Sequence, residues 1–221
     1  MSLYSDYLSN TGRPIHKMAH YFAIYERHFG FFVNRPLTFL EIGTGNGGSC
    51  QMWKRYFGPL ARIVTLDINP VCSAFSEDQI HVRIGDQSDP GFLDSVLEEF
   101  GPPDIVLDDG SHQMLHVAAS FDHLYGRMSP TGIYMIEDMH TAYWPDWGGG
   151  LGVSGSFVER FKSLIDDLNA DHHREGQSSP STFASSTFAM TAYDSVLVFE
   201  RAPAVSKVQK IIGDQALRVN Y

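Results

Sequence analysis

Residues 38–48 read TFLEIGTGNGG, a short apolar run followed by glycines in the spacing G-x-G-x-x-G at Gly43, Gly45 and Gly48. An apolar run bounded by turn residues predicts a buried strand. Glycine allows the tight turn that leads from a strand into a helix, and a helical pattern follows over about residues 49–57. The segment therefore predicts a strand, a glycine-rich turn and a helix, whose exposed backbone can receive a nucleoside or a dinucleotide.

The alternation of strand and helix continues along the chain. Four more apolar runs predict strands at residues 62–66, 81–84, 105–107 and 132–136. Helical spacing marks residues 90–100, 114–127 and 157–168, and alternating runs at 182–191 and 195–200 predict a β-hairpin. Strands that alternate with helices form a parallel sheet with helices on both faces. We therefore expect one α/β domain over residues 1–221, a doubly wound, mostly parallel seven-stranded sheet with an antiparallel C-terminal hairpin.

Two further segments lie outside this repeat. Residues 16–29, within an aromatic N-terminal segment at 12–30, have apolar side chains at helical spacing. This helix is too apolar to be freely solvated, so we expect it to cover the mouth of the site or to pack against another subunit in a homo-oligomer. Residues 143–156 are rich in tryptophan and glycine without a core pattern, and we expect them to form a lid loop.

Composition excludes several classes of partner. The net charge of −10 argues against nucleic acid and anionic membranes as binding partners. No apolar run is long enough to span a bilayer, and the N-terminus lacks the layout of a signal peptide. The two cysteines, Cys50 and Cys72, form neither a metal-type pair nor a disulfide framework. A cytoplasmic protein with a small-molecule substrate is the expectation.

Four acidic residues and a histidine follow two of the predicted strands: Asp108, Asp109 and His112 after 105–107, and Glu137 and Asp138 after 132–136. The carboxyl ends of parallel strands meet at one edge of the sheet, so these groups should share one crevice. Carboxylates so close repel one another unless they share protons or bind a cation, and oxygen ligands favour Mg²⁺ or another hard divalent ion. The alternative is that the acids cap helices and form turns, which explains single residues but not the repetition.

An acidic residue also ends the strand that follows the glycine turn. Asp67 lies 19 residues after Gly48, where a carboxylate can accept hydrogen bonds from both hydroxyls of a ribose. Asp86 ends the third strand, within reach of an adenine amino group, although a turn-forming aspartate fits there nearly as well. Both NAD and S-adenosylmethionine use such a site. A chain of this length leaves little room for the substrate domain that an NAD enzyme would need.

The motifs together resemble a known family. The sequence FLEIGTG, with Glu41 before the first glycine, resembles the first motif of class I S-adenosylmethionine-dependent methyltransferases. The further motifs LDINP, DDGSH and IEDMHTAYWP, with the aromatic N-terminal helix, resemble the metal-dependent sugar O-methyltransferases of natural-product pathways and the cephalosporin hydroxylase-like proteins. The likeness covers roughly residues 12–147, and the segment at 12–15 departs from the family's pattern.

The resemblance implies a reaction and a set of site residues. It implies an O-methyltransferase that transfers a methyl group from S-adenosylmethionine to a hydroxyl of a sugar or another small natural product. Asp109, Glu137 and Asp138 match the family's metal ligands, and His112 matches its catalytic base. The residues expected to contact the methyl donor are Glu41, Gly43, Thr44, Gly45, Gly47, Ser49, Asp67, Asp86 and Asp108. An NAD-type oxidoreductase and a non-catalytic cofactor-binding protein remain the alternatives.

Overall fold

The computed structural model describes residues 2–174, 180–205, 207–210 and 212–213. It contains one seven-stranded sheet in the order β3-β2-β1-β4-β5-β7-β6. The strands are β1 (Leu37–Ile42), β2 (Ala61–Asp67), β3 (Ile80–Ile84), β4 (Ile105–Asp108), β5 (Ile133–Ile136), β6 (Thr187–Tyr193) and β7 (Val196–Arg201). The first five are parallel, whereas β7 pairs antiparallel with β5 and β6. The predicted fold class is confirmed.

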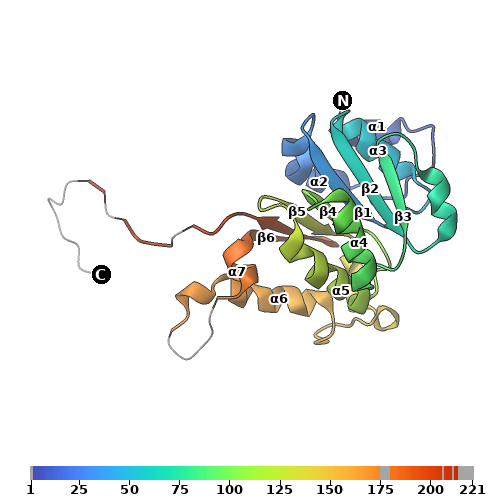
Figure 1. Ribbon diagram of the computed structural model, residues 1–221. Helices are drawn as coiled ribbons and strands as arrows, with labels where there is room; N and C mark the ends of the chain where they lie inside the picture. Colours follow the sequence, from blue (N-terminus) through green and yellow to red (C-terminus); the bar gives the residue numbers. More distant parts are fainter. Residues whose placement is uncertain (1, 175–179, 206, 211, 214–221) are drawn as a thin grey trace.

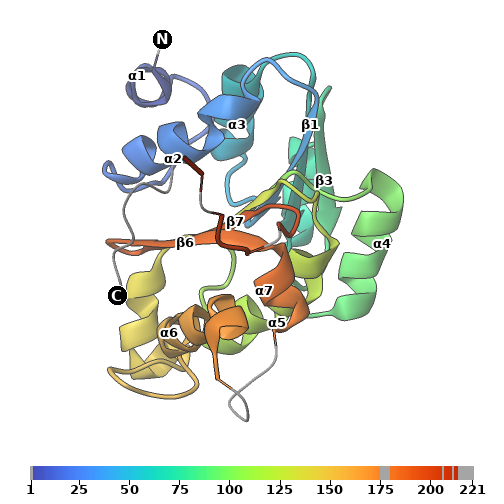
Figure 2. The same cartoon turned by 90° about the vertical axis from the view of Figure 1, so that its left-hand side faces the viewer.

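Helices cover both faces of this sheet (Figures 1 and 2). They are α1 (Leu3–Leu8), α2 (Tyr21–Phe29), α3 (Gly48–Phe57), α4 (Pro90–Phe100), α5 (Met114–Leu124), α6 (Phe157–Leu168) and α7 (Thr182–Ser186). The core on one face contains side chains of α1, α2 and α3, with the fully buried rings of Tyr25, Phe29 and Trp53. The core on the other face contains side chains of α4 to α7, with Phe121 and Phe199 at its centre.

The strand register brings the residues after β1, β2, β4 and β5 to one edge of the sheet. Ile42 of β1 pairs with Leu66 of β2 and with Asp108 of β4, which in turn pairs with Ile136 of β5. Backbone hydrogen bonds continue past the strands, from Asp109 N to Ile42 O at 2.9 Å and from Glu137 N to Asp108 O at 3.0 Å. The site residues predicted after these strands therefore have neighbouring positions in the backbone.

The N-terminal helix is shorter than predicted. Helix α2 begins at Tyr21, and residues 14–18 have no regular structure, although helical spacing predicted a helix from residue 16. These residues run across the start of α3, where a Cβ atom added to Gly48 would meet Pro14 O at 2.2 Å. The preceding helix α1 was not predicted. Because residues 14–18 pack closely against the start of α3, helix α2 does not begin before Tyr21.

The predicted C-terminal hairpin was wrong in its first part. Residues 182–186 form helix α7 and not a strand, because the Ser181 hydroxyl accepts a hydrogen bond from Ala184 N and caps a helical turn. At the end of the helix predicted at 114–127, α5 stops at Leu124 and a 3₁₀ turn, Tyr125–Arg127, follows. Local capping decided the first of these boundaries against the hydrophobic pattern.

Residues 143–156 fold into turns beside the same edge of the sheet. They follow a 3₁₀ helix at Met139–Tyr143 and include another at Pro145–Trp147. Gly150 N donates to Ala142 O at 2.8 Å, and the Ser156 hydroxyl caps α6. The Trp144 side chain remains about half exposed. The role of this segment as a lid remains a prediction.

We expect Gly43→Ala to lower the free energy of unfolding by about 2–3 kcal/mol. Gly43 has a φ of +97°, and a Cβ atom there would lie 2.1 Å from the Asp109 carbonyl oxygen. The substitution would therefore strain the backbone and push apart the ends of β1 and β4. Urea denaturation measures the change. Gly155→Ala is the matched control, since Gly155 has no atom within 4 Å of the added carbon; equal stability of the two variants would contradict the close approach.

Candidate active site

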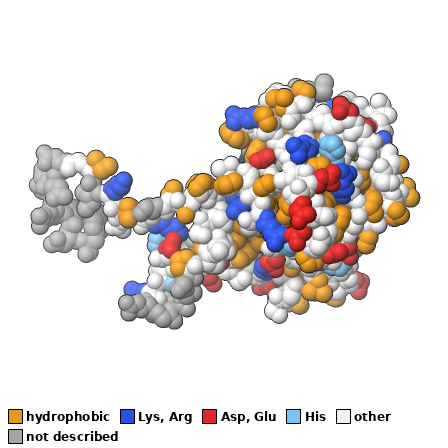
Figure 3. Space-filling view, viewed as in Figure 1, with side chains coloured by type: hydrophobic (Ala, Val, Ile, Leu, Met, Phe, Trp, Pro, Cys, Tyr) orange, Lys and Arg blue, Asp and Glu red, His pale blue; other side chains and the backbone are white. Residues whose placement is uncertain are grey.

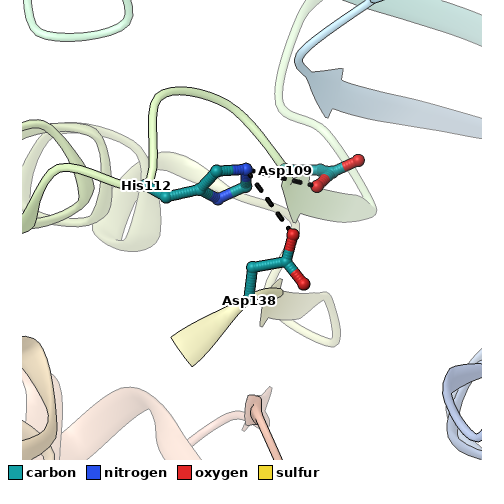
Figure 4. A group of neighbouring side chains, drawn as sticks. All are labelled: Asp109, His112 and Asp138. Atoms are coloured by element: carbon teal, nitrogen blue, oxygen red, sulfur yellow. Dashed lines mark ion pairs between the residues drawn. The ribbon is translucent and has the colours of Figure 1, made fainter. Parts of the chain in front are cut away.

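Three side chains converge beyond the ends of β4 and β5 (Figure 4). Asp109 follows β4, Asp138 lies two residues after β5, and His112 belongs to the loop between β4 and α5. The His112 Nε2 atom lies 3.8 Å from Asp109 Oδ1 and 3.6 Å from Asp138 Oδ2. One ligand atom from each of the three residues lies within 4.8 Å of the others, so the group could hold a metal ion. Asp109, Asp138 and His112 are therefore brought together as predicted.

The backbone at this site is held in an unusual conformation. His112 and Asp138 both have positive φ, at 56° and 54°, in the left-handed region that residues other than glycine seldom adopt. Such a conformation costs about 1–3 kcal/mol and clusters at functional sites. The Thr141 hydroxyl donates to Asp138 O at 2.8 Å and lies 3.3 Å from His112 O. This hydroxyl ties the two loops together, so the surrounding fold maintains the strain.

Lys17 lies among the acids, which the sequence did not predict. Its Nζ atom is 2.5 Å from Asp109 Oδ2, 2.9 Å from Glu137 Oε2 and 3.7 Å from Glu41 Oε1. Its side chain is 2% exposed. Burial lowers the pKa of Lys17, but the three carboxylates outweigh burial and hold that pKa well above its usual value. The acids therefore have a positive partner supplied by the chain itself.

Both carboxylate oxygens of Glu137 are hydrogen-bonded within the site. The Lys17 ammonium donates to its Oε2 atom and the Tyr25 hydroxyl to its Oε1 atom, and the residue is 1% exposed. Burial raises the pKa of Glu137 to about 8, and Lys17 opposes this shift. Asp109 and Asp138 thus lie beside His112, and Lys17 bridges Asp109 and Glu137.

Tyr21 and Tyr25 also belong to the site, although the sequence pattern indicated only that they are aromatic positions of a helix. The Tyr21 hydroxyl donates to Asp138 Oδ1 at 2.7 Å, and the Tyr25 hydroxyl donates to Glu137. Lys17, Tyr21 and Tyr25 follow one another at intervals of four residues, and residues at that spacing lie on one face of a helix. This spacing could have indicated that their polar groups act together. Position 17 precedes the helix, so periodicity alone would not place its side chain.

Two adjoining cavities lie over the glycine turn and share Gly43, Asp67 and Gly110. The first, about 200 Å³, extends from Asp67 to Asp86. The second, about 290 Å³, is lined by Thr44, Gly45 and Ser49 of the turn and by Lys17, Asp109, His112 and Asp138. A small molecule in the first cavity would therefore be continuous with the acidic group in the second.

Asp67 is fixed at the boundary of the two cavities. Its Oδ2 atom accepts from Thr44 N and Gly45 N, both at 3.0 Å, and its Oδ1 atom accepts from Asn69 N at 2.8 Å. Asp86 Oδ1 accepts from the backbone and hydroxyl of Ser88. Each carboxylate is oriented by local donors and still faces a cavity, which suits the predicted contacts with a ribose and an adenine.

Three residues predicted to contact the methyl donor line neither cavity: Glu41, Gly47 and Asp108. Glu41 is fully buried and accepts from Ser49 Oγ at 2.9 Å and from Trp53 Nε1 at 3.1 Å. Asp108 is 1% exposed and accepts from Ser120 Oγ at 2.6 Å. Successive side chains of a strand point to opposite faces, so Asp108 turns into the core while Asp109 faces the site. In this structure Glu41 and Asp108 therefore bind side chains of the core.

The N-terminal helix packs within its own chain. Tyr21, Phe22, Tyr25 and Phe29 are each no more than 2% exposed, against the face of the sheet that carries α3. This burial removes the reason for expecting α2 to pack against another subunit, and a homo-oligomer stays a prediction. On the face seen in Figure 3, basic and acidic side chains are interspersed. Among the described residues, no helix is long and apolar enough to cross a membrane.

No protein-family model matches the chain. Over 166 residues it is 43% identical to mycinamicin VI 2''-O-methyltransferase of Micromonospora griseorubida, an alignment covering 71% of this chain and 40% of that protein. Over 163 residues it is 40% identical to 8-demethyl-8-alpha-L-rhamnosyl tetracenomycin-C 2'-O-methyltransferase of Streptomyces olivaceus, covering 70% of this chain and 42% of that protein.

Solved structures show the same likeness. The MycE methyltransferase from the mycinamycin biosynthetic pathway, in complex with Mg, SAH and mycinamycin VI, matches with a TM-score of 0.77 and 38% identity. This match covers 91% of the present chain and 53% of that one. The chain thus spans about half the length of this relative, and about two fifths of the two curated relatives.

Proposed function

We propose that this chain, a relative of antibiotic-sugar O-methyltransferases with the class I methyltransferase fold, transfers a methyl group from S-adenosylmethionine to a hydroxyl of a sugar or other small natural product. The observation that carries the proposal is the junction of the two cavities. It joins the glycine turn and Asp67 to Asp109, Asp138 and His112 at one edge of the sheet. Donor and acceptor could therefore meet between them.

The glycine turn and its acids are suited to hold the donor. Gly43, Asp67 and Asp86 line the first cavity, where Asp67 is held by the turn's own amides. A carboxylate at the end of the second strand accepts hydrogen bonds from ribose hydroxyls in nucleoside-binding sheets. In this arrangement Gly43, Asp67 and Asp86 would hold the adenosine part in the first cavity, and the methyl group would lie on the side of His112 in the second.

A divalent cation fits the donor set beside His112. One oxygen of Asp109 and one of Asp138 lie within 4.8 Å of each other and could reach one ion, and carboxylates favour Mg²⁺ or Mn²⁺. Asp109 and Asp138 would hold the ion, and the role of Glu137 as a further ligand stays a prediction. Such a cation lowers the pKa of a bound hydroxyl and fixes its direction.

The remaining chemistry belongs to His112 and its neighbours. The acceptor oxygen forms a bond to the methyl carbon as the carbon–sulfur bond breaks, and the hydroxyl proton passes to His112 Nε2. Asp109 and Asp138 lie within 4 Å of that nitrogen and stabilise the imidazolium that results. Trp147, whose ring centre is 6.1 Å from that of His112, helps to exclude water from this side.

The proposal extends to the cell compartment. Cys50 and Cys72 are both free and buried, as a reducing compartment favours. We therefore place the reaction in the cytoplasm. NAD-dependent oxidation and binding without catalysis receive no support from the relatives, which are named methyltransferases.

A methyl-transfer assay with an unbiased set of glycosylated acceptors tests the proposed function. The purified chain is incubated with S-adenosylmethionine and Mg²⁺, and mass spectrometry follows both S-adenosylhomocysteine and the methylated acceptor. An acceptor whose mass rises by one methyl group supports the proposal. Thermal stabilisation by NADH but not by S-adenosylhomocysteine would favour the oxidoreductase instead.

We expect Asp67→Ala to weaken S-adenosylhomocysteine binding by about 1–3 kcal/mol, since the ribose hydroxyls would lose their acceptor. The turn would also lose the carboxylate that accepts from Thr44 N and Gly45 N. Calorimetric titration measures the loss, and Asp67→Asn is the matched variant because it keeps one acceptor oxygen. Binding by Asp67→Ala as tight as that of the natural chain would refute this placement of the ribose.

A further inference from the structure

Ser195 holds the backbone that follows Asp138. It lies in the turn between β6 and β7, far along the chain from β5. Its carbonyl oxygen accepts a hydrogen bond from Met139 N at 2.9 Å, and its hydroxyl oxygen accepts one from His140 N at 3.1 Å. One residue of the C-terminal hairpin therefore receives two successive amides of the segment after β5.

These two amides are the first of the 3₁₀ helix at Met139–Tyr143. The first amides of a helix have no partner within the helix, and the residue before it, the N-cap, usually receives one of them on its own side-chain oxygen. Aspartate is among the best residues for this role. Asp138 is the N-cap here, but its side chain makes no such bond. Ser195 therefore caps this helix in place of Asp138.

The Asp138 carboxylate is instead directed to the site. The Tyr21 hydroxyl donates to its Oδ1 atom at 2.7 Å, its Oδ2 atom lies 3.6 Å from His112 Nε2, and Asp138 lines the second cavity. An N-cap residue normally has an extended backbone, whereas Asp138 has a φ of 54°. Because this conformation is costly for aspartate, the surrounding contacts maintain it, and the two bonds to Ser195 hold the backbone directly after it.

Ser195 itself has a backbone conformation that favours glycine. Its φ is 63°, and a turn residue with positive φ is most often glycine. What serine adds at this position is its hydroxyl. The hydroxyl oxygen accepts from His140 N and also lies 2.6 Å from His140 Nδ1. The contacts that distinguish serine from glycine here are thus contacts with the segment after Asp138.

We propose that Ser195 is a positioning residue for the reaction, because by capping the helix after β5 it leaves the carboxylate of Asp138 free for the divalent ion. Without the hydroxyl, His140 N loses its acceptor, and Asp138 can relax to the extended backbone of an ordinary N-cap and turn its carboxylate to that amide. Ion binding then has to break this bond first, which lowers the affinity. The inference rests on the proposed function, which includes such an ion.

Titration with Mn²⁺, followed by calorimetry or by the electron paramagnetic resonance of the free ion, tests this role. We expect Ser195→Gly to bind Mn²⁺ about five- to tenfold more weakly than the natural chain, the factor that one lost capping bond corresponds to. Glycine keeps the carbonyl oxygen that receives Met139 N and adopts positive φ freely, so only the hydroxyl is lost. Equal affinity of Ser195→Gly and the natural chain overturns the inference.

Ser195→Asn is the conservative variant. Asparagine adopts positive φ more readily than most residues, and its side-chain oxygen caps helices as well as a serine hydroxyl does. It should therefore bind Mn²⁺ within about twofold of the natural chain, as an equivalent cap would. If Ser195→Asn binds as weakly as Ser195→Gly, the cap on His140 N is not what keeps the site intact, and the inference is overturned.

Thermal unfolding in excess chelator separates positioning from support of the fold. Ser195→Gly should melt within about 2 °C of the natural chain, because relief of the strained turn offsets the lost cap. Ser181→Ala is the matched control, since it removes a hydroxyl that accepts from Ala184 N in α7, away from both cavities. It should melt about 2–4 °C lower and leave Mn²⁺ affinity unchanged. A lower melting temperature of Ser195→Gly with unchanged Mn²⁺ affinity would make Ser195 a structural cap only and overturn the inference.

The inference and the proposed function fail separately. A crystal structure of metal-free Ser195→Gly should show the Asp138 carboxylate accepting from His140 N, and a carboxylate that still faces His112 overturns the inference whether or not the chain binds an ion. If Asp138 has turned in this variant but the natural chain binds no Mn²⁺, Ser195 keeps its role and the metal part of the proposed function is wrong. If the natural chain binds Mn²⁺ and Ser195→Gly binds it equally well, the role of Ser195 is wrong and the proposed function stands.

Discussion

Asp138→Asn should reduce methyl transfer by about 100-fold or more, because metal assistance is worth several kcal/mol of transition-state stabilisation. The substitution is nearly isosteric and keeps an oxygen that can accept from the Tyr21 hydroxyl, which donates to Oδ1 at 2.7 Å. What is lost is the charge on Oδ2, the oxygen that faces His112. Steady-state kinetics with a methylatable acceptor measures the change, and Mn²⁺ titration should show weaker ion binding in parallel.

Tyr21→Phe is the control for this variant. It removes the hydrogen bond to Asp138 but leaves its charge, so the rate should fall by less than about tenfold, as for a single hydrogen bond. S-adenosylhomocysteine should bind both variants as tightly as the natural chain, because neither residue lines the first cavity. Full activity in excess chelator, together with an active Asp138→Asn, would remove the divalent ion from the reaction.

The edge of the sheet where the site forms was predictable from the sequence. Short apolar runs predicted five parallel strands, and the rule that ligands bind at the carboxyl ends of such strands predicted one shared crevice for the acids and His112 that follow β4 and β5. These residues need only the backbone register to come close, and Ile42, Leu66, Asp108 and Ile136 do pair across adjacent strands. The prediction succeeded because strand order and register are set by patterns several residues long.

Which of the acids face the cavities and which face the core was not predictable in the same way. Glu41 and Asp108 were expected to contact the donor, but each side chain is satisfied by buried partners, Trp53 and Ser120 among them. Successive side chains at a strand end point to opposite sides, so a shift of one residue along the chain decides whether a side chain faces the site or the core. The alternation of faces along β4 could have separated Asp108 from Asp109.

Lys17 lay beyond sequence reasoning for a different reason. It is 92 residues from Asp109 and 120 residues from Glu137 in the chain, and it belongs to a stretch without regular structure. No periodicity places a side chain there. Only the packing of residues 14–18 over the glycine turn brings its ammonium group to the acids, and that packing is a tertiary property of the whole N-terminal segment.

His112→Asn should lower the rate of methyl transfer by about 10²–10⁴-fold, the usual contribution of a general base. Asparagine is the informative replacement because it adopts positive φ more readily than most residues, and His112 has a φ of 56°. The loop should therefore keep its conformation and its contact with Thr141, while the nitrogen that accepts the proton is lost. His123→Gln is the control, since His123 is hydrogen-bonded to Asp94 on α4, away from both cavities.

Two binding measurements identify which role of His112 is lost. As a base, His112 acts on the acceptor, so His112→Asn should bind S-adenosylhomocysteine normally and lose much less Mn²⁺ affinity than a variant that removes a ligand carboxylate, such as Asp109→Asn. A loss of Mn²⁺ affinity as large as that of Asp109→Asn would make His112 a metal ligand instead, as its distance from both carboxylates also permits. Because the Asp109 and Asp138 carboxylates lie within 4 Å of Nε2, they would stabilise the imidazolium even without an ion. An active His112→Asn would mean that a different group takes the proton.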